Sequence, residues 1–190
     1  MSCPLVSFII VCTFCIALLV PLGVSVYRPI LHSSHLSISP EAFIVSGYGE
    51  QNASHCGPNR ASALDKGCRF DPMSFSWLPV ACYDQDLIDD FLDADDWRWY
   101  MDMHMSKQAD RAGVLTGQHG SLYVTHRYHM YHCLYMWRKL HRAMESGRPI
   151  DGYIRDYHHT VHCGEMLLLN DTADQDVDSI IVTKYPTCLG

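Results

Sequence analysis

The residues best suited to chemistry lie between positions 126 and 163, where the pattern His-x-x-His-Cys occurs twice. The first copy runs from His129 to Cys133 and the second from His159 to Cys163. Seven of the 12 histidines fall in this window, so chance clustering explains the repeat poorly. Imidazole and thiolate groups are both common metal ligands, and the repeat therefore predicts a metal site.

The segments that carry the two pentads predict a pair of antiparallel helices. Residues 125–145 have a helical pattern that ends at Gly147, a favourable residue just after a helix, and Pro149 follows. Asp151 can cap a second helix that continues into the second pentad. The short turn between the two segments predicts a helical hairpin.

Folding the chain about this turn brings the two pentads to the same height. In this register we expect His132 to face Cys163 and Cys133 to face His162. Histidines three residues apart lie on one helix face, with Cβ atoms roughly 5–6 Å apart, so each pentad can hold an ion with two imidazoles.

Four histidines can therefore converge between the helices. The predicted catalytic residues, which are also predicted metal ligands, are His129, His132, His159 and His162. Cys133 and Cys163 are either two further ligands or, in an oxidising compartment, a disulfide. Two thiolates would suit a closed structural zinc site, whereas an all-histidine site would be open to external ligands and favours redox copper. Copper is the predicted cofactor, and zinc is the weaker candidate.

The N-terminal segment predicts an attachment to a membrane. Residues 4–27 carry no charged side chain and exceed the roughly 20 apolar residues that span a bilayer. We expect a transmembrane anchor at 1–28, a stalk rich in Ser, Pro and Gly at 29–54, and a domain at 55–190. A cleaved signal peptide is the alternative, although no basic residue precedes the apolar run.

Two kinds of residue place the domain in the secretory lumen or outside the cell. Asn52 and Asn170 begin glycosylation sequons, which matter only there. Residues 55–190 hold six cysteines, an even number that predicts disulfides. Arg28 alone favours the cytosol through the positive-inside rule, and one arginine is weak support. We expect a disulfide that joins Cys56 or Cys68 to Cys82 or Cys188.

The rest of the domain is expected to be mainly α with a few short strands. Asp84 can cap a helix whose apolar face includes Leu87, Ile88 and Phe91. Residues 122–124 and 180–182 are expected to pair as the only sheet. The net charge of -7 argues against a nucleic-acid partner, which would need a basic face.

The two pentads and their surroundings resemble the fungal UstYa-like oxidases, single-pass membrane proteins defined by two His-x-x-His-Cys motifs. The segments 55–57, 67–71 and 77–84 also look like this family, and the resemblance covers roughly residues 55 to 170. It implies copper-dependent oxidation in fungal secondary metabolism, often of ribosomal or cyclic peptides. The implied reactions are oxidative cyclisation, hydroxylation and chlorination.

The sequence thus predicts a membrane-anchored, copper-dependent oxidase that acts on a peptide or small-molecule metabolite in mycotoxin biosynthesis. One alternative is a non-catalytic accessory subunit of such an oxidase, stabilised by zinc or a disulfide. Another is a disulfide-rich binding module whose histidines sense pH. A homodimer, or a heterodimer with another family member, is compatible with the sequence.

Overall fold

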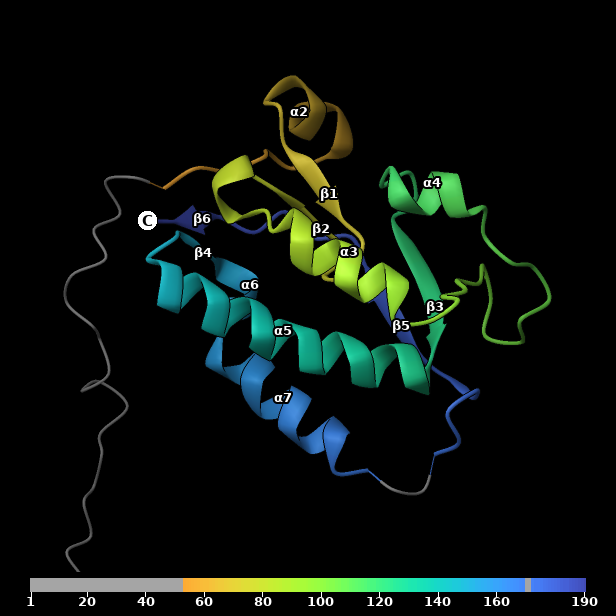
Figure 1. The fold of residues 1–190 in the computed structure, drawn as a ribbon. Helices are drawn as coiled ribbons and strands as arrows, with labels where there is room; N and C mark the ends of the chain where they lie inside the picture. The colour runs from red at the N-terminus through yellow and green to blue at the C-terminus, as the bar shows by residue number, and fades with distance from the viewer. Residues whose placement is uncertain (1–52, 170–171) are drawn as a thin grey trace, which may run out of the picture. The chain divides into compact units, whose positions relative to one another are not determined.

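The computed structural model describes residues 53–169 and 172–190 (Figure 1). The predicted anchor, nearly all of the predicted stalk, and the asparagines Asn52 and Asn170 lie outside this range. Within it, no helix is long and apolar enough to cross a membrane. The predicted fold class, a spanning helix joined to a mainly α domain, is therefore corrected for the described residues to a helical domain with short paired strands.

Helix α5 runs through the domain with other elements on both sides (Figure 1). Helix α3 packs on one side of it, and α6 and α7 pack on the other. The described helices are α2 (Arg60–Asp65), the 3-10 helix η3 (Val80–Cys82), α3 (Gln85–Asp93), α4 (Arg111–Leu115), α5 (His126–Ser146), α6 (Gly152–Arg155) and α7 (Tyr157–Leu167). The described strands are β1 (Arg69–Asp71), β2 (Ser76–Leu78), β3 (Ser121–Thr125), β4 (Ile150–Asp151), β5 (Val177–Val182) and β6 (Cys188–Leu189).

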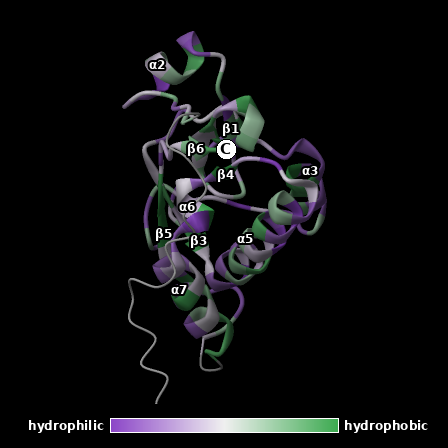
Figure 2. Ribbon diagram, turned by 90° about the vertical axis from the view of Figure 1, so that its left-hand side faces the viewer, coloured by the Kyte–Doolittle hydropathy of each residue, from purple (hydrophilic) through white to green (hydrophobic). Residues whose placement is uncertain are grey.

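The first helix of the predicted hairpin is confirmed as α5. The Thr125 side chain accepts a hydrogen bond from the Tyr128 amide at its start, which satisfies a free N–H of the first turn. Gly147 ends the helix at φ 63°, a left-handed conformation that glycine adopts without steric cost. Hydrophobic and hydrophilic residues both occur along α5, as expected for a helix with one buried face (Figure 2).

The second helix of the hairpin is broken in two. Asp151 caps α6 as predicted, because its carboxylate accepts from the Tyr153 and Ile154 amides. At Asp156 the backbone leaves the helical region, with ψ 114°, and the Asp156 side chain accepts from the His158 amide to start α7. The second pentad therefore lies on α7, a helix separate from α6.

The predicted pairing of residues 122–124 with 180–182 is confirmed, with Leu122 opposite Ile181 in the antiparallel pair β3–β5. The prediction that this is the only sheet is wrong. Strands β1 and β2 form a second antiparallel pair, and β4 and β6 form a third. These strands are two or three residues long, too short for an alternating pattern to mark them in the sequence.

Two disulfides close the fold around these short strands. Cys56 pairs with Cys68 and Cys82 pairs with Cys188. The predicted bridge from Cys56 or Cys68 to Cys82 or Cys188 is therefore wrong, because each cysteine pairs within its own group. The second bridge joins residues 106 positions apart and holds β6 against η3. Closing so long a loop removes much conformational freedom from the unfolded chain.

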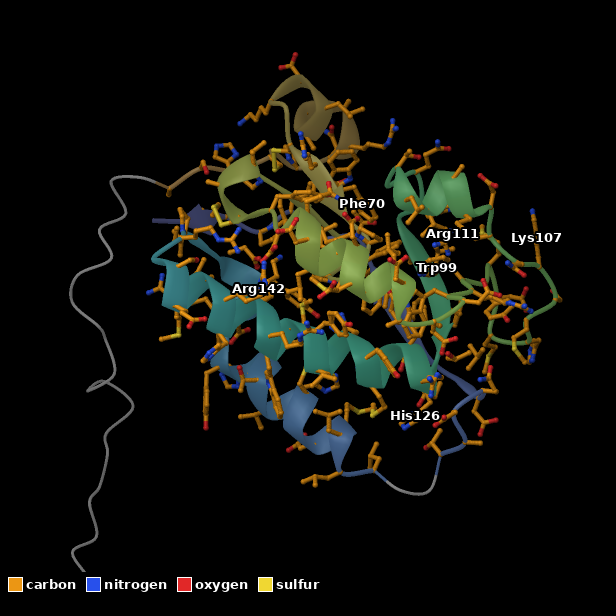
Figure 3. The ribbon with its side chains drawn as sticks, in the orientation of Figure 1. Phe70, Trp99, Lys107, Arg111, His126 and Arg142 are labelled. Atoms are coloured by element: carbon orange, nitrogen blue, oxygen red, sulfur yellow. A yellow bond between two sulfur atoms is a disulfide. The ribbon has the colours of Figure 1, made fainter. Side chains whose placement is uncertain are left out.

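Aromatic side chains fill the core between α3 and α5. The predicted α3 begins after its cap Asp84 and buries Leu87, Ile88 and Phe91. Phe91 stacks on Trp97 at 5.0 Å between ring centroids and meets Tyr128 edge-on. Figure 3 marks Trp99 and Phe70, two further buried rings of this core. Such pairs add to the free energy gained by burial alone.

A buried ammonium group links α5 to two other segments. Lys139 is 2% exposed, and its Nζ lies 3.0 Å from the Asp71 carboxylate and 2.9 Å from the Asp151 carboxylate. Burial favours the neutral amine, but the two carboxylates outweigh burial and raise the pKa of Lys139. The charged triad is therefore the stable state in the folded domain.

We predict that Lys139→Met destabilises the domain by about 3–5 kcal/mol, because it leaves two buried carboxylates without a cation. Urea unfolding followed by circular dichroism measures the loss. Arg138→Met is the matched control one residue away. The side chains of Arg138 and its partner Asp90 are 41% and 59% exposed, and surface ion pairs contribute about 0–1 kcal/mol. Adding Asp71→Asn to Lys139→Met should recover part of the stability. Equal losses for the two single variants would contradict this account.

Candidate metal centre

The structure brings the four motif histidines together in two pairs, each with one member on α5 and one on α7. The Nε2 atoms of His132 and His159 are 3.4 Å apart, and those of His129 and His162 are 3.3 Å apart. The pentads thus lie at one level of the hairpin, as predicted. The predicted partners are wrong, because His132 lies beside His159 and His129 lies beside His162.

Hydrogen bonds at Nδ1 orient the two histidines of α5. His132 Nδ1 lies 2.7 Å from the Met73 carbonyl oxygen, which can only accept, so Nδ1 carries the hydrogen. His129 Nδ1 lies 2.7 Å from Ser179 Oγ, whose own hydrogen is donated to Asp178 at 2.7 Å. In both rings the Nε2 lone pair therefore points toward the partner histidine. This is the arrangement that a metal-binding imidazole needs.

Burial keeps these imidazoles neutral. It lowers the pKa of His129 to about 4, with a further contribution from the nearby His162, and it holds the pKa of His132 well below its ordinary value. Neutral imidazole is the form that binds metal ions, so His129 and His132 need no deprotonation at neutral pH.

The spacing of each pair suits one metal ion. Two nitrogens at about 2.0–2.1 Å from an ion, at a tetrahedral angle, are about 3.3–3.4 Å apart. In the part of the chain that the structure describes, however, no three His, Cys, Asp or Glu side chains form a group that could hold a metal ion as they stand. The histidines therefore fit a metal as pairs, and each pair leaves the other coordination positions to groups outside the four.

The two motif cysteines lie beside one of these pairs. Cys133 and Cys163 are buried free thiols that share a hydrogen bond, and Cys163 Sγ is 3.5 Å from His159 Nε2. The hydrogen bond from Cys133 and a further one with His159 lower the pKa of Cys163. The same hydrogen bond, together with burial, raises the pKa of Cys133. Of this facing pair, Cys163 is the thiol that also contacts a motif histidine.

Tyr153, which the sequence analysis did not single out, lies at the centre of the site. Its hydroxyl donates to His132 Nε2 at 3.3 Å, and its ring packs on His159 at 4.0 Å between centroids. Burial, followed by the two thiols, raises the pKa of this phenol, so it stays protonated. The signal in the sequence was the cap at Asp151, which places Tyr153 in the first turn of α6 beside the histidines.

The tyrosines that the pentads themselves contain or adjoin have other environments. Tyr128 is buried in the core and donates to the Pro72 carbonyl oxygen at 2.7 Å. Tyr157 is 74% exposed at the start of α7. The remaining histidine at the start of α5, His126, is buried, and its Nδ1 lies 2.6 Å from a carboxylate oxygen of Asp178 on β5. His126 is therefore held by β5, next to Ser179.

A cavity of about 450 Å³ opens beside the histidines, within the range of small-molecule sites. Its lining includes His129, His132, His162 and Tyr153, together with residues 178–182 of β5. Lys184 adds a cation, with Nζ 4.5 Å from the Tyr153 ring centroid, and burial lowers the pKa of this lysine to about 8. The remaining lining residue is Met166, and the β5 residues are Asp178, Ser179, Ile180, Ile181 and Val182.

Two curated proteins of Diaporthe leptostromiformis are similar to this chain: phomopsin biosynthesis cluster proteins B and B'. Each is 26% identical to it over 157 residues, and the alignment covers 73% of this chain. The matched segment covers 46% of each relative, so the chain spans less than half of their length. No family model and no solved structure matches the chain. Its relatives thus belong to a fungal secondary-metabolite cluster.

We predict that Cys133 and Cys163 are alkylated only after unfolding, and without a reductant, because both are buried thiols. Mass spectrometry of tryptic peptides from the full chain, labelled before and after unfolding in urea, measures this. Cys82 and Cys188 serve as internal controls, since their disulfide should block the label until reduction. A peptide pair linked through Cys133 and Cys163 would contradict the thiol assignment.

Proposed function

We propose that this chain is a copper-dependent oxidoreductase of fungal secondary-metabolite biosynthesis. The observation that carries the proposal is the meeting of four histidines from two helices in Nε2 pairs 3.4 and 3.3 Å apart. These pairs adjoin a cavity of small-molecule size. The similarity to proteins of the phomopsin cluster supports a biosynthetic role.

Copper suits the donors of this site better than other common ions. Imidazole binds copper, zinc, iron and nickel, and copper(II) has the highest intrinsic affinity among divalent first-row metals. The residues that would hold it are His129, His132, His159 and His162, with the Cys163 thiol beside His159. When bound, copper supplies one-electron redox chemistry with dioxygen.

The residues of the chain position this chemistry. Met73 and Ser179 fix the ring orientation of His132 and His129 through Nδ1, so both rings are set before a metal arrives. Tyr153 donates a hydrogen bond to His132 Nε2, so this lone pair has a partner in the metal-free protein. The phenol must turn away or lose that hydrogen bond when His132 binds a metal.

The cavity indicates the kind of substrate. Its lining includes the apolar residues Ile180, Ile181 and Val182 of β5, and Lys184 and Asp178 add one cation and one anion. We propose a metabolite, or a side chain of a peptide, with an apolar body and a polar group.

The two disulfides are consistent with an oxidising compartment, and we propose that the domain works in the secretory lumen or outside the cell.

Metal analysis of the purified full chain tests the proposal. We expect stoichiometric copper by mass spectrometry, with nitrogen hyperfine structure in the electron paramagnetic resonance spectrum of copper(II). His162→Ala breaks the His129–His162 pair and should lower bound copper to the amount that the intact His132–His159 pair holds. His141→Ala is the matched control, because His141 is an exposed histidine outside the pentads, on α5. Circular dichroism of each variant checks that it is folded.

Stoichiometric zinc without copper would overturn the copper assignment and support the accessory-subunit alternative. Full copper content in His162→Ala would overturn the assignment of the paired histidines.

We also predict that Ser179→Ala weakens copper binding about 10–100-fold, since it removes the oxygen that orients His129. Competition titration with a copper chelator measures the affinity. Ser121→Ala on β3 is the control, because Ser121 is exposed and Ser179 lies on the paired strand. Equal affinities for the two variants would show that Ser179 has no role in orienting the ring.

A further inference from the structure

The loop between Tyr100 and Gln108 carries an unusual set of side chains. Three of the nine methionines lie within five residues, at 101, 103 and 105, and His104 lies among them. Met101, Met103 and Met105 are 44%, 57% and 47% exposed. Methionine more often fills gaps in a core, so three methionines about half exposed in one loop are unusual. We call residues 101–107 the methionine loop.

The backbone of the methionine loop is closed at its base. Tyr100 pairs with Gln108 in a β-bridge, and the Met101 amide donates to the Lys107 carbonyl oxygen at 2.8 Å. A second bond, from the Ala109 amide to the Trp99 carbonyl oxygen at 2.8 Å, ties the base to the core. Figure 3 marks Lys107 on the side of the domain where the loop projects. The loop therefore has one defined path and is held clear of the core.

Asp102 organises the interior of the methionine loop. Its carboxylate accepts from the amides of His104, Ser106 and Lys107 and from the Ser106 hydroxyl, at 2.7–3.2 Å. Both oxygens are thus engaged with the loop's own donors. A hard cation such as Ca²⁺ or Mg²⁺ would need those oxygens, so the carboxylate does not favour one. The thioethers and the imidazole are left as the free donors.

The donor chemistry selects one ion. Thioether sulfur is a soft ligand that favours copper(I), and imidazole also binds copper. Four donors within five residues are close enough along the chain to reach one ion, because each methionine side chain has three rotatable bonds. Exposure lets an ion enter and leave without opening the fold.

We propose that the methionine loop is a copper(I)-binding site, formed by Met101, Met103 and Met105 with His104, and separate from the histidine pairs. It captures copper(I) from solution or from a donor protein. The site goes beyond the proposed oxidoreductase function, and it stands whether or not the histidine pairs hold copper.

Nuclear magnetic resonance of the full chain, labelled with ¹³C at the methionine methyl groups, tests the site directly. Copper(I) is added without oxygen. We expect the methyl signals of Met101, Met103 and Met105 to shift together and to saturate at one equivalent. Met144, which is 66% exposed on α5, is the matched control and should stay unshifted at that point. Single Met→Leu variants assign the signals.

The triple variant Met101→Leu, Met103→Leu, Met105→Leu should lose this copper(I) equivalent, with an affinity at least about tenfold weaker in a chelator competition. Its thermal unfolding should match that of the parent, because surface substitutions of similar size change stability little. His104→Ala should weaken binding less than the triple variant does.

Shifts that grow without saturation, or that reach Met144 at the same copper(I) concentration, would overturn the proposal. Copper(II) content at the histidine pairs is measured in the same triple variant. Loss of copper(I) at the loop with normal copper(II) at the histidines separates this site from the proposed function. Failure of the histidine site would leave the methionine shifts in place.

Discussion

The buried ammonium group of Lys139 connects the parts of the chain that build the histidine site. Asp71, one of its two partners, also accepts from the Met73 and Ser74 amides and so shapes the turn between β1 and β2. That turn presents the Met73 carbonyl oxygen to His132. Asp151, the other partner, caps α6 and thereby places Tyr153 against the same histidine. One cation on α5 thus holds two sides of His132.

Burying such a triad costs free energy, and breaking it is strongly destabilising. We infer that its main role is to fix one geometry of the segments that it joins. Hydrophobic residues in its place would leave the turn and the cap without a common anchor. The histidine rings are consequently set by contacts from outside the helix hairpin, and the hairpin alone does not orient them.

Much of this arrangement could be predicted from local patterns. Capping residues, a terminal glycine and the spacing of the pentads were enough to predict α5, its turn and the common level of the histidines. The break at Asp156 could not be predicted from the sequence. The His158 amide can donate either to the Asp156 side chain, which starts a new helix, or to a backbone carbonyl of a continuous helix. The histidine partners across the hairpin also differ from those predicted.

Long-range features were the hardest to anticipate. Tyr153 and Ser179 reach the site through the folding of α6 and β5, and neither belongs to a motif. Similarly, the partner of Cys82 lies 106 positions away, and spacing alone carries no information about it. The short strands β4 and β6 exist only because these segments meet.

The position of β5 late in the chain has a consequence for assembly. During synthesis both pentads emerge before residues 177–182, so the strand that carries Ser179 follows both histidine motifs in the chain. Cys188, the partner of Cys82, comes later still. His129 therefore cannot gain its Ser179 contact, and the long disulfide cannot close, until this last part of the described chain has been made.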